Sequence, residues 1–263
     1  LSVVPGPRGH ALCLDYDLGG NGFVIARRPL DLALPEDYAF TLETRGEGPA
    51  RIVEFKLVDE ALGNVWRLRD ERFVYHRDWT PWRIAAQDIE YAWGARRQTV
   101  LAHADALEIA VVGSGPGRLW LAELALEDLS PRGSPRVTAS SAAPERDAAR
   151  VLNGDDGWLS AAGGEQSLTL EFDMPRALGA LGIHWDAAAP PASFQLAARD
   201  ADGAWRTLRA VDAPPAAHSL LLLPGLRATA LRLDCVAAGA ACGIARLELH
   251  PWHYARTLLD GLT

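Results

Sequence analysis

Three stretches in the second half of the chain decide the fold: residues 137–160 (VTASSAAPERDAARVLNGDDGWLS), residues 194–208 (FQLAARDADGAWRTL) and residues 229–250 (TALRLDCVAAGAACGIARLELH). The first predicts a loop that crosses a Gly/Asp-rich turn to a buried tryptophan. The second predicts a β-hairpin, because Asp and Gly at 200–203 supply the positive φ angles that a tight turn needs. The third predicts a closing strand pair at 229–236 and 243–250.

Alternating apolar and polar residues continue this pattern along the whole chain. Residues 147–152 are the one stretch that suggests a turn or short helix. Short strands separated by Gly, Pro, Asp and Asn are typical of antiparallel β-sandwiches, and about eight strands in each half is the jelly-roll number. The predicted strands of the first half are 11–18, 23–34, 38–45, 52–58, 65–69, 79–85, 107–112 and 118–126. Those of the second include 167–172, 178–185, 194–199, 205–210, 218–223 and the closing pair.

The domain boundary is expected at a short Pro/Gly/Ser segment, residues 130–135 (SPRGSP). It separates a first domain at 1–129 from a second at 136–251. Residues 252–263 then form either a tail that docks on the domains or the start of a linker to a further domain, since an isolated segment with Trp252 and Tyr254 exposed would be unusual.

Composition excludes several classes of protein. An apolar fraction of 49% in 263 residues suits packed cores and argues against general disorder. The net charge of −8, without a basic cluster, argues against a nucleic-acid partner. We find no apolar run that approaches a membrane span, and no secretory signal in residues 1–9.

The three cysteines are too few for a disulfide framework. Cys235 and Cys242 could pair across the loop between the last two strands, which would fit an oxidising compartment. Cys13 lies between two leucines and is expected to be a buried thiol.

The three stretches of the second half resemble the discoidin domain, also called the coagulation-factor C-type domain, which bacteria use as a carbohydrate-binding module. The first half resembles a galactose-binding-like jelly roll related to carbohydrate-binding module family eleven, through residues 11–19 (ALCLDYDLG), 54–66 (EFKLVDEALGNVW), 89–94 (IEYAWG) and 119–126 (LWLAELAL). The resemblance implies two tandem galactose-binding-like domains at the front of a larger bacterial glycoside hydrolase. It also implies a secreted or periplasmic location.

Candidate ligand residues come from strands 52–58 and 65–69 and from the tryptophans of the first half. Sugars bind against flat aromatic rings, and charged side chains hydrogen-bond their hydroxyl groups. The candidates are Glu54, Lys56, Trp66, Arg69, Trp79, Trp82 and Trp93. The alternative for each tryptophan is burial in a sandwich core, and the charged residues could form cross-strand ion pairs only.

The resemblance also implies a structural Ca²⁺ held by hard oxygen ligands. The matching residues in the second domain are Asp155, Asp156 and Glu248. Asn153 stands where the family has Asp, and an expected Thr is missing, which weakens the site. The alternative is an Asp/Gly turn satisfied by its own backbone. In the first domain, Asp15 or Asp17 with Glu123 could form a similar site.

No catalytic motif is present, and many acidic residues occur without any indication that two of them pair across a cleft. The main hypothesis is a tandem of non-catalytic modules that directs an attached catalytic domain to a polysaccharide. The second is a structural platform that packs against that domain without sugar affinity. The third is catalysis by a lone jelly roll acting as a lyase or hydrolase.

Overall fold

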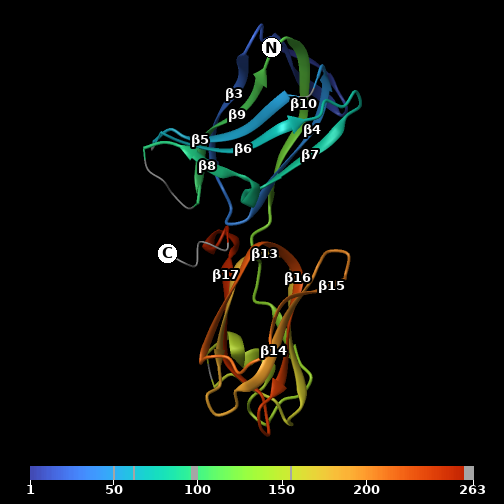
Figure 1. Ribbon diagram of the computed structural model, residues 1–263. Helices are drawn as coiled ribbons and strands as arrows, with labels where there is room; N and C mark the ends of the chain where they lie inside the picture. Colours follow the sequence, from blue (N-terminus) through green and yellow to red (C-terminus); the bar gives the residue numbers. More distant parts are fainter. Residues whose placement is uncertain (50, 62, 96–99, 155, 258–263) are drawn as a thin grey trace. The chain divides into compact units, whose positions relative to one another are not determined.

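The computed structural model describes residues 1–49, 51–61, 63–95, 100–154 and 156–257. The chain divides into two compact units, Leu1–Ser130 and Pro131–Thr263, called unit 1 and unit 2 here (Figure 1). All strand pairings are antiparallel, and the helical elements of the described residues are short 3-10 turns. The predicted all-β sandwich class is confirmed. The alternating apolar and polar residues predict it correctly because a strand places alternate side chains on opposite faces.

Unit 1 is a sandwich of two five-stranded sheets. The first has the order β1 (Ser2–Gly6), β2 (Gly9–Asp17), β10 (Pro116–Asp128), β4 (Tyr38–Glu47) and β7 (Thr80–Ala85). The second has the order β3 (Gly22–Ala33), β9 (His103–Gly113), β5 (Arg51–Asp59), β6 (Asn64–Phe73) and β8 (Glu90–Trp93), with the turn η1 (Ala86–Asp88) between β7 and β8.

The core of unit 1 lies between these sheets. Phe40 on β4 and Phe55 on β5 are both buried, and their ring centroids are 5.0 Å apart, so they join the two layers directly. On β5, the central strand of its sheet, Val53, Phe55 and Leu57 are fully buried. The side chains between them therefore lie on the outer face of this sheet.

Unit 2 is built on one hydrogen-bonded system of seven strands. The order is β12 (Trp158–Leu159), β17 (Gly243–Pro251), β13 (Glu165–Trp185), β16 (His218–Ala237), β14 (Pro191–Arg199) and β15 (Trp205–Val211), and β11 (Arg136–Ala139) also pairs with β13. The turns are η2 (Ala148–Leu152) and η3 (Trp252–Tyr254).

Two long strands give unit 2 its layers. β13 and β16 each cover two strands that the sequence predicts as separate, 167–172 with 178–185 and 218–223 with 229–236, and Pro175 and Pro224 lie between them. The prolines fall in two gaps of the β13–β16 ladder, at 172–175 and 223–225, where a missing N–H donor removes no ladder bond. Beyond these gaps the partners change: β14 pairs with residues 230–237 of β16, and β17 pairs with residues 178–185 of β13. Each long strand thus pairs with different neighbours along its two halves.

The same pairing corrects the predicted closing pair. β16 and β17 are not hydrogen-bonded to each other, because β13 lies between them in the strand order. The predicted hairpin is confirmed as β14 and β15, with Gly203 at φ +85° in its turn.

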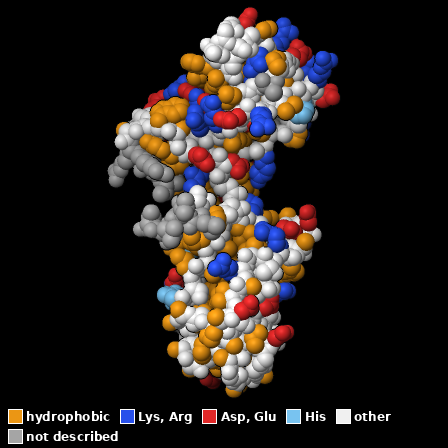
Figure 2. Space-filling model, in the orientation of Figure 1, with side chains coloured by type: hydrophobic (Ala, Val, Ile, Leu, Met, Phe, Trp, Pro, Cys, Tyr) orange, Lys and Arg blue, Asp and Glu red, His pale blue; other side chains and the backbone are white. Residues whose placement is uncertain are grey.

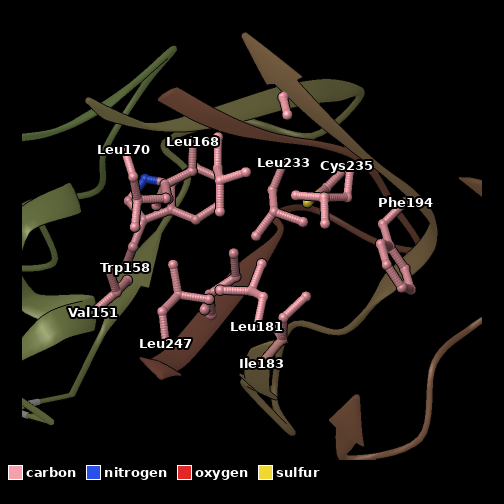
Figure 3. Close-up of a cluster of buried hydrophobic side chains, with 14 of the residues drawn as sticks. Val151, Trp158, Leu168, Leu170, Leu181, Ile183, Phe194, Leu233, Cys235 and Leu247 are labelled. Carbon is pink, nitrogen blue, oxygen red and sulfur yellow. The ribbon is translucent and has the colours of Figure 1, made fainter. Parts of the chain in front are cut away.

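The core of unit 2 contains the tryptophan that the first stretch predicts as buried. Trp158 is fully buried, and its indole N–H donates to the carbonyl of Ser141 at 2.8 Å. Figure 3 shows Leu168 and Leu181 of β13 pointing into the same cluster, together with Leu233 of β16 and Leu247 of β17. The core is therefore assembled from strands that are distant in sequence.

The cysteines and the beginning of the tail are also placed. All three cysteines are buried thiols, as predicted for Cys13, and no Cys235–Cys242 disulfide is present. The hydrogen bond with Cys242 and burial raise the pKa of the Cys235 thiol. Trp252 is buried within unit 2, whereas Tyr254 is half-exposed and stacks on His250 with ring centroids 4.1 Å apart. Residues 258–263 lie outside the described part of the chain.

Candidate functional site on the outer face of unit 1

The outer face of the β3–β9–β5–β6–β8 sheet carries an unusual set of buried charges. Glu54 and Lys56 on β5 point away from the core, yet only 3% and 7% of their surfaces are exposed. The strand register places Glu54 opposite Arg69 and Lys56 opposite Arg67 on β6. The four charged side chains therefore lie side by side at the centre of the sheet.

Glu54 is the anchor of this cluster. Its Oε2 lies 2.9 Å from Lys56 Nζ, and its Oε1 accepts hydrogen bonds from Arg67 at 2.7 Å and from Arg69 at 2.5 Å. Figure 2 shows Lys/Arg and Asp/Glu side chains gathered over β5 and β6. One carboxylate thus holds three cations in fixed positions, and about a third of each guanidinium side chain remains exposed.

The electrostatics of Glu54 follow from this arrangement. Burial acts to raise the pKa of Glu54, but the hydrogen bonds from Lys56 and Arg69 and the charges of Lys56 and Arg67 outweigh it. The pKa therefore lies below its usual range. A carboxylate in this state is ionised at neutral pH and acts as a fixed acceptor rather than as a proton donor.

An exposed indole stands beside the cluster. Trp93, at the end of β8, pairs in register with Val65 of β6, and 48% of its surface is exposed. Lys56 Nζ lies 5.6 Å and the Arg67 guanidinium 5.4 Å from the centroid of its ring, distances at which cation–π attraction operates. We call Glu54, Lys56, Arg67, Arg69 and Trp93 together the charged face.

The opposite edge of the same sheet carries a second aromatic. Phe23 on β3 is 68% exposed. The ladders place it opposite Val112, which lies opposite Ile52. Ile52 is two residues from Glu54 on the same strand, so Phe23 shares its face. Arg27 of β3 bonds Glu108 of β9 at 2.6 Å between these edges.

The structure brings four of the seven predicted ligand residues together and separates the others. Glu54, Lys56, Arg69 and Trp93 meet on the charged face. The prediction for Trp66 is wrong: the residue is 2% exposed and faces the interior, with its ring centroid 5.6 Å from that of Tyr91. An alternating strand that carries Arg67 and Arg69 outward must turn Trp66 inward.

Trp82 and Trp79 also lie away from the cluster. Trp82 of β7 belongs to the other sheet, and its ring packs edge-on against Phe55 and Phe73 at centroid distances of 6.3 and 5.0 Å. Its role is to join the two sheets. Trp79 is partly buried just before β7.

Sequence reasoning missed Phe23 and Arg27 and did not place Arg67 among the ligand residues. The alternation of β3 and β6 was a usable signal. Alternation divides each strand into two sets of side chains, but the register between strands that are distant in sequence decides which set faces the solvent beside Glu54.

The predicted calcium ligands do not meet among the described residues. Asp155 lies outside the described part of the chain. Asp156 is 4.0 Å from Arg150, whereas Glu248 Oε1 is 3.1 Å from Arg246 and 3.4 Å from His184. In the first domain, Asp15 pairs with Arg118 and Glu123 with Arg8. Within the described ranges, no group of three or more His, Cys, Asp or Glu is arranged to hold a metal ion.

Comparisons with known proteins give distant similarities. No model of a protein family matches the chain, and no curated protein matches it significantly. Among solved structures, chitosan-binding module 1 of a Paenibacillus sp. IK-5 chitosanase/glucanase is 18% identical, with 44% of this chain and 95% of that chain covered and a TM-score of 0.41. The family 32 carbohydrate-binding module of Clostridium perfringens NanJ, in complex with galactose, is 13% identical, with 44% and 92% covered and a TM-score of 0.39.

A larger protein with a comparable match is a GH29 fucosidase of Ruminococcus gnavus. It is 14% identical, with 45% of this chain and 25% of that chain covered and a TM-score of 0.41. Identities and scores this low leave the function of this chain to be argued from its own side chains. Within the described residues, no helix has the length and apolar character needed to cross a membrane.

Proposed function

We propose that the chain is a non-catalytic carbohydrate-binding protein, and that the charged face of unit 1 holds an oligo- or polysaccharide. The observation that carries this proposal is an exposed indole, Trp93, set beside guanidinium groups fixed by a buried carboxylate. A pyranose ring offers C–H groups to an aromatic face and hydroxyl groups at its edge, so it needs both kinds of partner at once.

The hydrogen-bonding capacity of the charged face fits hydroxyl groups. A guanidinium carries five N–H donors, and the hydrogen bond of Arg67 to a described residue uses NH1 alone. The remaining donors can reach a ligand. Because Glu54 fixes both arginines before binding, less side-chain entropy is lost when a sugar docks.

In the cell, the proposed role is to bring an attached catalytic domain to its polysaccharide outside the cytoplasm. The alternative of a packing platform expects Trp252 and Tyr254 as an apolar surface. The burial of Trp252 within unit 2 does not favour that alternative.

The test is retention of the full chain on a panel of insoluble plant and microbial polysaccharides, followed by calorimetry with soluble oligosaccharides of the retained type. Trp93→Ala should weaken binding about tenfold or more, which corresponds to about 1.4 kcal/mol. Tyr254→Ala, which removes a comparably exposed aromatic from unit 2, is the matched control and should bind as the parent does.

Repeating the measurement with Ca²⁺ and with a chelator tests the predicted calcium site. A chelator-sensitive affinity would support a bound ion, and equal affinity would argue against one that matters for binding. Failure of every glycan to retain the chain would refute the carbohydrate-binding proposal for the charged face.

A further inference from the structure

A groove lies in unit 2 and is lined by residues of β13, β16, β14 and the end of β15. Its volume is about 590 Å³, within the range of ~300–1,000 Å³ that small-ligand sites occupy. Leu168, Leu233 and Leu196 on these strands are fully buried, and their outward neighbours line the groove together with the buried Phe194 and Cys235. We call it the unit 2 groove, and its principal polar residues are Glu165, Ser193, Gln195, Asp212, Arg232 and Asp234.

The groove has unused hydrogen-bonding groups. Arg232 Nε and the carboxylate of Asp234 lie 3.0 Å apart, so these two satisfy each other. Among the described residues, no side chain forms a hydrogen bond or ion pair with the side chains of Gln195, Glu165 or Asp212. Gln166 is bonded to Ser140, Ser141 and Gly163, so Gln195, Glu165 and Asp212 are the groups that a polar ligand can use.

The charge of the groove restricts that ligand. Three carboxylates line it, and Arg232 is the one cation among its described lining residues. Since Arg232 is paired with Asp234, Glu165 and Asp212 remain as two uncompensated negative charges. A ligand with positive groups is favoured, because opposite charges attract and like charges repel across a shared surface.

An aromatic ring lies beside the same groove. The centroid of Trp205 of β15 is 4.7 Å from the Arg232 guanidinium and 5.5 Å from that of Arg199, and 37% of its surface is exposed. Arg232 therefore connects the indole to Asp234 inside the groove. An indole beside amide, hydroxyl and carboxylate groups suits a sugar ring better than it suits an extended basic peptide.

We infer that the unit 2 groove binds an oligosaccharide bearing free amino groups, with Glu165 and Asp212 as the partners of the ammonium groups. This site is separate from the charged face of unit 1 and does not depend on it. It gives unit 2 a binding role, although its Ala-rich loops at 187–189 and 237–241 suggest a mere spacer.

The experiment is calorimetry of the full chain with a β-1,4-linked glucosamine oligosaccharide and with its N-acetylated counterpart, at a pH of about 5.5, where Asp and Glu are ionised. The glucosamine oligosaccharide should bind about tenfold or more tightly than the acetylated one. Raising the salt should weaken it, because ions screen exposed charges.

Variants locate the site. Glu165→Gln combined with Asp212→Asn should weaken the glucosamine oligosaccharide about tenfold or more. The control Asp202→Asn, in the exposed turn between β14 and β15, should leave the affinity unchanged. Tyr254→Ala, which alters neither the groove nor the charged face, should also leave it unchanged. All altered side chains are exposed, and thermal unfolding verifies that the variants fold.

Four results would overturn the inference: no binding of either oligosaccharide, equal affinity for both, unchanged affinity in the double variant, or a loss in Asp202→Asn as large as in the double variant. Oligolysine serves as the probe for a basic peptide. If it binds the groove as tightly as the glucosamine oligosaccharide, the groove recognises positive charge alone, and the assignment of a saccharide ligand is refuted.

Discussion

The anchor role of Glu54 makes a quantitative prediction about unit 1. Glu54→Gln keeps the size of the side chain and one acceptor oxygen but removes the negative charge. The side chain of Lys56 is 8% exposed and cannot reach bulk water without moving, whereas the side chains of Arg67 and Arg69 are about a third exposed. The variant therefore leaves the buried ammonium of Lys56 without its carboxylate partner, whereas the two arginines can hydrogen-bond to water instead.

The expected loss follows from that distinction. Removing one partner of a buried ion pair costs ~3–5 kcal/mol. The amide still accepts a hydrogen bond, so we expect the lower end, about 3 kcal/mol in the free energy of unfolding of unit 1. For a domain of this size, each kcal/mol lowers Tm by roughly 3–4 °C, so the Tm of the unit 1 transition should fall by about 10 °C.

The assay is calorimetric or fluorescence-monitored unfolding of the full chain, with parent, Glu54→Gln and the double variant Glu54→Gln/Lys56→Met. The double variant removes the stranded charge as well and should recover at least half of the loss, since replacing a buried pair by an apolar one is often neutral.

The loss should also depend on pH. The depressed pKa of Glu54 means that its contribution is present above the unfolded pKa of about 4.3 and disappears as the pH falls through the lower folded pKa. Parent and Glu54→Gln should therefore converge in stability in strong acid. A loss below about 1 kcal/mol at neutral pH, the range of exposed ion pairs, would refute the argument, as would a double variant no more stable than the single one.

Three further predictions concern other parts of the chain. The hydroxyls of Tyr16 and Tyr75 are 2.6 Å apart, and burial is the main cause that raises both pKa values. Their contribution to the free energy of unfolding of unit 1 should therefore be complete below pH ~10 and decrease above it. Tyr75→Phe should make this decrease smaller in unfolding measured at increasing alkaline pH. Cys235 and Cys242 are buried, so a thiol reagent should leave them unlabelled in the native state and label them after denaturation; native labelling would contradict their burial. Gly157 has φ +65°, and a Cβ there would lie 2.1 Å from a β17 carbonyl oxygen, so Gly157→Ala should destabilise unit 2 by more than about 1 kcal/mol; an unchanged Tm would show that the turn can relax.

Much of the fold could be predicted from local pattern. The hairpin of β14 and β15 follows from its turn residues, and the burial of Trp158 follows from its place after a Gly/Asp-rich turn. The long strands β13 and β16 could not be predicted in the same way, because Pro175 and Pro224 read locally as breaks. Only the ladder shows that the prolines fall where the sheet needs no N–H donor from them.

The candidate site divides in the same manner. Local alternation alone predicts that Glu54 and Lys56 share one side of a strand, and that Trp66 lies on the other side of its strand from Arg67 and Arg69. The reason is that a period of two residues is a property of the backbone. The pairing of distant strands is needed to show that Glu54 meets both arginines, that Trp93 is exposed beside them, and that unit 2 carries a charged groove. Strand register and solvent exposure depend on contacts between residues far apart in the chain, and no local pattern encodes them.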